Sequence, residues 1–400
     1  DVAFRRFNTP AGKIATFSTS FGLGAASINT ATATTAFGVN ALALNTAAQG
    51  NTAVGSSALA SNNGNGVSFA GSNNTAVGTS ALTSNTTGRF NTAIGTAALS
   101  SNINAEYNVG IGSNALRDNT TGDSNIGIGI NALLVNTIGY DNVAIGLQAL
   151  DANTSGRENV AIGSQALTSN VTGIQNVGIG FNALTGNLGS ANIGIGWNAS
   201  PAVGTYFNNV AIGFQSLERN TQSSNNTAIG FQTLTFLNNN IAQKNVAVGF
   251  WSMQNSSGSV EGNSFLGAES GRRSTGIFST GVGFQALGSL AGPANSGIQN
   301  TAVGQQALAF NGSGQQNSAL GAESLYRVTS GSFNTGVGYR AGGAVTNGTN
   351  NTYIGYQSGS NATTGTNNST LGFNAQLPAA NTSNYIQLGN TAIATIHGQV

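Results

Sequence analysis

Residues 142–158 read NVAIGLQALDANTSGRE, and residues 159–175 repeat the pattern as NVAIGSQALTSNVTGIQ. Each block holds 17 residues, and an Asn-x-x-apolar-Gly motif of this kind recurs 22 times along the 400-residue chain, usually 17 residues apart. We number every repeat from its motif glycine, so that Gly146 and Gly163 occupy position 0. A fixed period indicates one small structural unit stacked many times, rather than a series of separate domains.

Positions −3 to −1 have the pattern of a short β-strand. Position −1 is apolar in every repeat, position −3 is Val, Ile, Thr or Ser, and position −2 is mostly Ala or Gly. Such alternation is typical of strands, and the Asn-Thr-Thr-Gly stretch later in the repeat favours a turn. Seventeen residues are too few for a strand–helix–strand crossover. We therefore expect an all-β fold, a parallel β-roll or β-solenoid of about 22 coils.

The distribution of charged residues suggests which positions face inward. From Arg89 onward, no charged residue falls at positions −4 to 0 or at +3 and +4. Because a buried unpaired charge is costly, we predict that these positions form the interior and the packed faces. The predicted core has apolar residues at −1, partners at −3 and Leu at +4, and it includes Ile94, Ile111, Ile128, Ile145, Ile162, Ile179, Leu150 and Leu167.

The small residues at −2 and 0 are predicted to form a second surface. They combine Ala and Gly on the strand face opposite the isoleucines. A smooth strip of this kind allows the backbone of another chain to approach closely. We infer from it that copies associate along the length of the solenoid, most simply as a bundle of three chains.

Asparagine forms two columns in the repeat. It occupies position −4 in 18 of the 22 repeats and returns at +7, for example at Asn136 and Asn153. Stacked coils would place these amides about 4.8 Å apart, close enough to hydrogen-bond from coil to coil. We interpret both columns as structural ladders rather than as glycan-recognition sites.

Composition argues against several functional classes. The chain has 12 Lys and Arg, 11 Asp and Glu, one His and no Cys. A net charge of +1 offers no electrostatic attraction for nucleic acid or an anionic membrane, and no apolar run is long enough to span a bilayer. No Ser/His/Asp set can be assembled around His397. We predict that the protein is not an enzyme and holds neither a metal nor a cofactor.

One column of charges has the spacing of a catalytic pair. Glu106 and Asp123 occupy position +11 in successive repeats, between Arg89 and Asp141. Stacked carboxylates would lie about 5 Å apart, near the separation in a retaining glycosidase. We interpret the column as a solvated loop edge in which Arg89 offsets Glu106, because nothing in the pattern would raise the pKa of either carboxyl. The GGxGxD pattern of calcium-binding β-rolls is absent.

Aromatic residues at position +1 are candidates for receptor or subunit contacts. They occur in consecutive repeats, as Phe181, Trp197, Phe214, Phe231 and Phe250. If the strand continues past the glycine, the rings share a face with −1 and belong to the core or a subunit interface. If the chain turns there, they form an exposed stripe suited to glycan stacking or lateral contact.

Four longer repeats insert loops at 61–73, 235–244, 256–262 and 289–299. Loops on a rigid scaffold often carry recognition residues, although insertions are also tolerated without any function. Within these loops, the candidate recognition residues are Phe69, Phe236 and Leu237.

The NxAIG…AL units resemble the head repeats of trimeric autotransporter (YadA-like) adhesins, although the 17-residue unit here is longer. The unit NTAVGxxALxSNTTGxx is similar to repeat regions of phage tail fibres and related bacterial surface proteins. The segment NYIQLGNTAIATIHGQV from Asn384 resembles the junction before an endosialidase-type intramolecular chaperone. The resemblance implies a left-handed parallel β-roll, intertwined or side by side in a homotrimer. It also implies an extracellular location, on a virion or a cell-surface appendage.

We expect residues 1–17 to form an attachment or capping segment or a frayed terminus, and residues 18–383 to form the solenoid shaft. Residues 384–400 are expected to form a terminal repeat and the junction to a C-terminal domain. The expected function is a structural and adhesive fibre, a rigid trimeric rod that presents loops to a cell-surface glycan or protein receptor. The alternatives are a filament subunit without a ligand, a glycan-degrading tailspike and an ice-binding solenoid.

Overall fold

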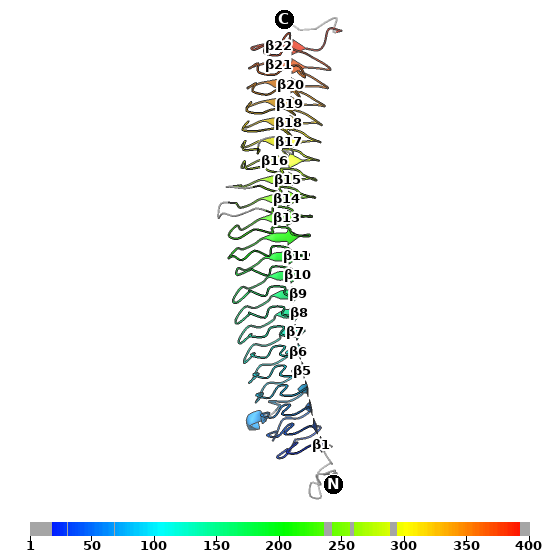
Figure 1. Ribbon diagram of the computed structural model, residues 1–400, viewed down its shortest axis with the longest axis vertical. Coiled ribbons are helices and arrows are strands. Elements are labelled where there is room, and N and C mark those ends of the chain that lie inside the picture. Colours follow the sequence, from blue (N-terminus) through cyan, green and yellow to red (C-terminus); the bar gives the residue numbers. More distant parts are fainter. Residues whose placement is uncertain are drawn as a thin grey trace. The chain divides into compact units, whose positions relative to one another are not determined.

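The computed structural model describes residues 18–29, 31–67, 69–235, 242–256, 260–288 and 294–392. This part of the chain is all-β apart from one short 3-10 turn, η1 (Gly64–Gly66), and it divides into two compact units. Each unit is a parallel β-solenoid with one three-residue strand in each turn of the chain (Figure 1). The predicted all-β class and the solenoid architecture are confirmed. The expected segment 1–17 and the last residues of the expected junction, 393–400, lie outside the described residues.

The first unit contains the described residues up to Asn198, together with Val203–Thr205. Its strands are β1 (Thr19–Phe21), β2 (Thr35–Phe37), β3 (Thr52–Val54), β4 (Thr75–Val77), β5 (Thr92–Ile94), β6 (Val109–Ile111), β7 (Ile126–Ile128), β8 (Val143–Ile145), β9 (Val160–Ile162), β10 (Val177–Ile179) and β11 (Ile193–Ile195).

The second unit contains Ala199–Ala202 and the described residues from Tyr206 onward. Its strands are β12 (Val210–Ile212), β13 (Thr227–Ile229), β14 (Val246–Val248), β15 (Ser264–Leu266), β16 (Thr280–Val282), β17 (Thr301–Val303), β18 (Ser318–Leu320), β19 (Thr335–Val337), β20 (Thr352–Ile354), β21 (Ser369–Leu371) and β22 (Ile386–Leu388).

Identical positions of neighbouring coils stack directly on one another. β8 pairs in parallel with β9, so that Ala144 lies opposite Ala161 and Ile145 lies opposite Ile162. The same register joins each consecutive pair from β1 to β11 and from β12 to β22. Position 0 must be glycine in this arrangement. Gly146 has φ +136°, and a Cβ there would lie 2.5 Å from the carbonyl oxygen of Gly163 in the next coil.

Each coil turns through left-handed residues that are not glycine. In the coil of β8 these are Gln148, Leu150 and Glu158, with φ of 56°, 52° and 58°. Such conformations cost about 1–3 kcal/mol each, so they persist only where the surroundings hold them. Here the backbone N–H of Leu150 donates to Ala166 of the following coil (3.0 Å), and that of Glu158 donates to Tyr140 of the preceding one (3.1 Å). The shape of one coil therefore depends on its neighbours.

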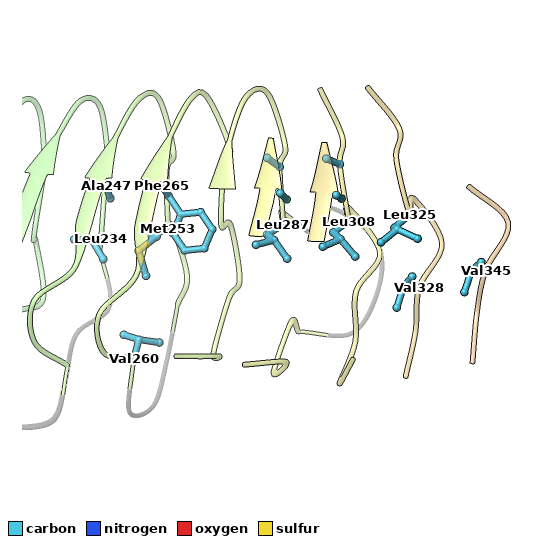
Figure 2. Close-up of a cluster of buried hydrophobic side chains, with 14 of the residues drawn as sticks. Leu234, Ala247, Met253, Val260, Phe265, Leu287, Leu308, Leu325, Val328 and Val345 are labelled. Atoms are coloured by element: carbon cyan, nitrogen blue, oxygen red, sulfur yellow. The ribbon is translucent and has the colours of Figure 1, made fainter. Parts of the chain in front are cut away.

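The interior is lined by position −2 together with +3 and +4. Ala144 at −2 and Leu150 and Leu167 at +4 are fully buried, which confirms the predicted leucine column. Figure 2 shows this column in the second unit, where Leu287, Leu308 and Leu325 lie in one row.

The prediction that apolar residues at −1 line the interior is wrong. The side chains of Ile94, Ile145 and Ile162 are 36–39% exposed, and the list of half-buried residues at the same position includes Ile111, Ile128 and Ile179. The predicted Ala/Gly contact strip is wrong for the same reason, since its −2 residues face inward. Alternation shows which residues share a face, but it does not show which face is turned inward, so a shift of one residue exchanges the two.

The width of the interior explains why the small residues lie inside. Across each coil, position −2 faces the leucine at +4. A Cβ added to Gly110 at −2 would lie only 3.2 Å from Cγ of Leu99. The space therefore holds one leucine and one alanine or glycine, and a second branched side chain would overfill it.

Two coils reverse the small and large positions. Phe265 and Tyr353 occupy position −2, where other coils have small residues, and both rings are buried. Glycine then replaces leucine at +4 of the same coil, as Gly271 and Gly359. A Cβ at Gly271 would lie 2.6 Å from the Phe265 ring, and one at Gly359 would overlap the Tyr353 ring. Figure 2 shows Phe265 projecting into the space that leucine fills elsewhere.

The asparagine column at −4 is buried and hydrogen-bonded. Asn142 Nδ2 donates to the carbonyl oxygen of Gly156 in its own coil (2.8 Å) and to Asn125 Oδ1 of the coil before (3.1 Å). Asn142 Oδ1 accepts the backbone N–H of Asn159 in the coil after (3.1 Å). Each such amide closes its own coil and also joins the next two along the stack.

The column at +7 completes this arrangement. Asn153 is buried, and its Nδ2 donates to Asn136 Oδ1 (2.7 Å) and to the carbonyl oxygen of Gly156 (3.1 Å). The Gly156 carbonyl therefore accepts from both columns, which holds the start and the end of the coil together. The interpretation of both columns as structural ladders is confirmed.

The substitution Asn142→Leu should destabilise the fold, because it leaves the buried N–H of Asn159 without an acceptor and removes a donor to Gly156. We expect a loss of about 1–3 kcal/mol for each buried group left unpaired, measured as a lower midpoint of urea unfolding by circular dichroism. The exposed Glu158→Ala variant is the control and should change stability by less than about 0.5 kcal/mol. Equal losses from both variants would contradict a structural role for the amide ladder.

The pairing of Tyr353 with Gly359 predicts a rescue experiment. Gly359→Leu should lower the melting temperature, because the new side chain overlaps the Tyr353 ring. The double variant with Tyr353→Ala restores the Ala/Leu pairing of the ordinary coils and should recover most of the loss. Backbone strain cannot mimic this result, since Leu150 has φ 52° and Gly359 has φ 60°. A double variant less stable than Gly359→Leu alone would show that the two positions are not coupled.

Candidate functional site

The outer face of the sheet is apolar and free of charge in both units. Position −1 projects outward in every strand, and its more exposed members include Leu266, Leu320 and Leu371, each at least half exposed. Position −3 lies beside it and is occupied by Val, Ile, Thr or Ser. No charged residue occurs in any of the strands β1–β22. A sheet face turned to water normally carries polar side chains, so solvent alone does not account for this surface.

The aromatic residues at +1 lie beside this face and are exposed. Phe181, Trp197, Phe214, Phe231 and Phe250 are 38–46% exposed, so the interpretation that places them in the interior of the coil is wrong. In the second unit, the ring centroids of Phe214 and Phe231 are 5.0 Å apart and those of Phe231 and Phe250 are 5.2 Å apart. The rings stack face to face along the coils and present their edges outward.

A second aromatic stack continues the pattern near the end of the described chain. Tyr339, Tyr356 and Phe373 have centroid separations of 5.3 Å at both steps. The Arg340 guanidinium lies 5.2 Å from the centre of the Tyr339 ring, a cation–π distance. This contact joins the aromatic column to neighbouring polar residues at +2.

The loop candidates do not converge on a site. Phe69 is 64% exposed and has φ 65°, at the tip of the inserted segment 61–73. Phe236 and Leu237 lie outside the described residues. Phe69 is therefore an accessible apolar residue, and no pocket among those described includes it.

The acidic column has the geometry of an ion-paired loop edge. Arg89 Nε donates to Glu106 Oε1 (2.8 Å), and this bond raises the pKa of Arg89 above its usual value. Asp123 Oδ1 accepts the backbone N–H of Glu106 (2.7 Å). Both carboxylates are thus engaged in structural contacts, as expected for that interpretation. His397 lies outside the described residues, and the described ranges contain no group of three or more His, Asp or Glu placed to hold a metal ion.

Sequence analysis did not identify a groove of about 320 Å³ on the side of the coils of β18, β19 and β20. Its polar lining consists of Glu323, Tyr326, Arg327, Arg340, Gln357 and Ser360. Arg340 Nε donates to Glu323 Oε2 across one wall (2.7 Å). The signal that could have revealed it is the pair Gly343-Ala344 one repeat after the bulky Tyr326-Arg327. Such a drop in side-chain size at equivalent positions leaves a hollow between stacked coils.

No family model matches this sequence, and comparison with curated proteins finds no relative. Among the described residues, no helix has the length and apolarity that a membrane span requires.

Proposed function

We propose that this protein is a structural and adhesive extracellular fibre, built from homotrimers that associate through the outer face at positions −3 and −1. The observation that carries the proposal is the uncharged apolar stripe that follows both stacks of strands. Continuous exposed apolar patches of this kind mark protein–protein contacts. The stripe replaces the Ala/Gly strip as the proposed contact between chains.

The energetics favour association over many coils at once. Full burial of an isoleucine contributes about 1.5–3 kcal/mol, so covering the exposed third of Ile145 contributes about 0.5–1 kcal/mol. Association itself costs about 4–15 kcal/mol. A few coils would therefore not hold two copies together, whereas a stripe repeated in every coil supplies enough apolar area. Such an interface suits an elongated fibre.

The number three and the extracellular location rest on the resemblance to adhesin heads and phage tail fibres. The absence of cysteine and the low charge are compatible with that setting. Adhesion is supported by surfaces that stacking leaves available, namely the aromatic edges, Phe69 and the groove near Arg340. A filament subunit without a ligand shares the stripe and would lack recognition by these surfaces. A glycan-degrading tailspike would need a catalytic pair, and the paired carboxylates of Glu106 and Asp123 do not favour one.

Two adjacent substitutions separate assembly from folding. Ile145→Asp places a charge on the outer face and should leave the coil folded while weakening association. Ala144→Asp places the same charge in the filled interior and should destabilise the coil, by several kcal/mol for a buried unpaired carboxylate. Native mass spectrometry and light scattering report the oligomer, and circular dichroism reports the fold. We expect a trimer of the natural chain. A natural chain that stays monomeric at high concentration would overturn the proposed assembly, and a dimer would overturn the number three.

Adhesion is tested with the intact chain on an array of cell-surface glycans and on whole cells. We expect saturable binding to a subset of glycans or cells. Binding to neither would favour the ligand-free filament. Release of new reducing ends from a bound polysaccharide would favour the tailspike instead.

A further inference from the structure

The groove on the coils of β18 to β20 gathers charges in a chain that has very few. The chain contains 12 basic and 11 acidic residues in 400, yet Glu323, Arg327 and Arg340 line one groove. Two guanidinium groups and one carboxylate give the groove a net positive charge. Its volume, about 320 Å³, is at the lower end of the range for small-molecule sites.

Side-chain size explains why the groove is open here. Tyr326 and Arg327 occupy positions +5 and +6 of one coil, and Gly343 and Ala344 occupy the same positions of the next. The two small residues form a floor, and Tyr326 stands at its edge, fixed by an edge-on contact with Phe310 (ring centroids 4.9 Å apart). The hollow is therefore built into the stacking of the coils.

Several donors in the groove have no partner within the described part of the chain. Arg327 takes part in no ion pair there, and Arg340 uses its Nε toward Glu323. The side-chain amide of Gln357 also makes no hydrogen bond, unlike Gln306 at the same position, whose Nε2 donates to Gln285 Oε1 (2.7 Å). Gln357 lacks such a bond because Arg340 occupies +2 of the coil before.

We infer that this groove binds a sugar unit that carries a carboxylate, an inference that rests on the proposed adhesive function. Guanidinium groups match a carboxylate in shape and charge, because their parallel N–H groups can donate to both of its oxygens. The Gln357 amide, the Ser360 hydroxyl and the second oxygen of Glu323 can exchange hydrogen bonds with sugar hydroxyls. Glu323 also disfavours a multiply charged anion such as phosphate. The Tyr326 ring offers an apolar surface beside these polar groups.

The test compares two disaccharides that differ in one group. Cellobiouronic acid carries a carboxylate where cellobiose carries a hydroxymethyl group, and binding to the intact chain is measured by calorimetry and saturation-transfer NMR. We expect the acid to bind at least tenfold more tightly than cellobiose, and the difference to shrink in high salt. Arg327→Ala should reduce the affinity for the acid at least tenfold. Ala344→Leu, which fills the floor, should do the same.

Matched controls use the same positions in other coils. Arg219→Ala removes an arginine at +6, and Ala152→Leu enlarges an alanine at +6, and neither lies in the groove. Both should leave the affinity unchanged. The inference is overturned if acetate or inorganic phosphate binds as tightly as the acid disaccharide, or if the folded Arg327→Ala variant keeps full affinity.

The same data separate this inference from the proposed function. If the intact chain binds cells or other glycans but neither disaccharide, the groove assignment fails and adhesion stands. If the acid binds in the groove while the chain adheres to no cell or glycan surface, the groove assignment stands and adhesion fails.

Discussion

Every coil depends on a buried amide pair that closes it. The carbonyl of Gly156 accepts from Asn142 at the start of its coil and from Asn153 near the end. Because these amides are out of contact with water, each donor left unpaired would cost stability, and each amide also bonds to the coil before it. Closure of one coil and attachment to the next are therefore the same interaction. The left-handed leucine and glutamine residues of the turns persist because of this mutual support.

The narrow interior then determines what the outside looks like. One leucine faces one alanine or glycine, so branched residues of the strand have no room inside and project outward. The uncharged outer stripe follows from this constraint combined with the lack of charge in any strand. Polar variety is confined to the turns, at +2, +5 and +6, and there a local drop in side-chain size opens the groove beside Arg327.

The repeat period, the strand positions, the leucine column and the asparagine ladders could all be predicted, because each depends on local pattern and on stacking identical units. The direction in which the strand faces could not. Both Ile145 and Ala144 belong to uncharged columns, so the absence of charge marks an interior and an exposed contact face alike. Choosing between them needs the width of the coil, which is set by contacts such as Gly110 with Leu99. The groove escaped prediction because it arises from two adjacent coils, and no single repeat contains it.

The exchanged pairs Phe265 with Gly271 and Tyr353 with Gly359 bear on how so uniform a chain finds its order. Nearly equivalent repeats could stack after skipping a neighbour, with 17 residues looped out and most contacts preserved. A skipped repeat near Tyr353 would instead press its ring against a leucine, since Gly342 of the preceding coil also makes room for that ring. The irregular coils thus act as checkpoints that penalise miscounting, in places where the ordinary repeats cannot tell one another apart.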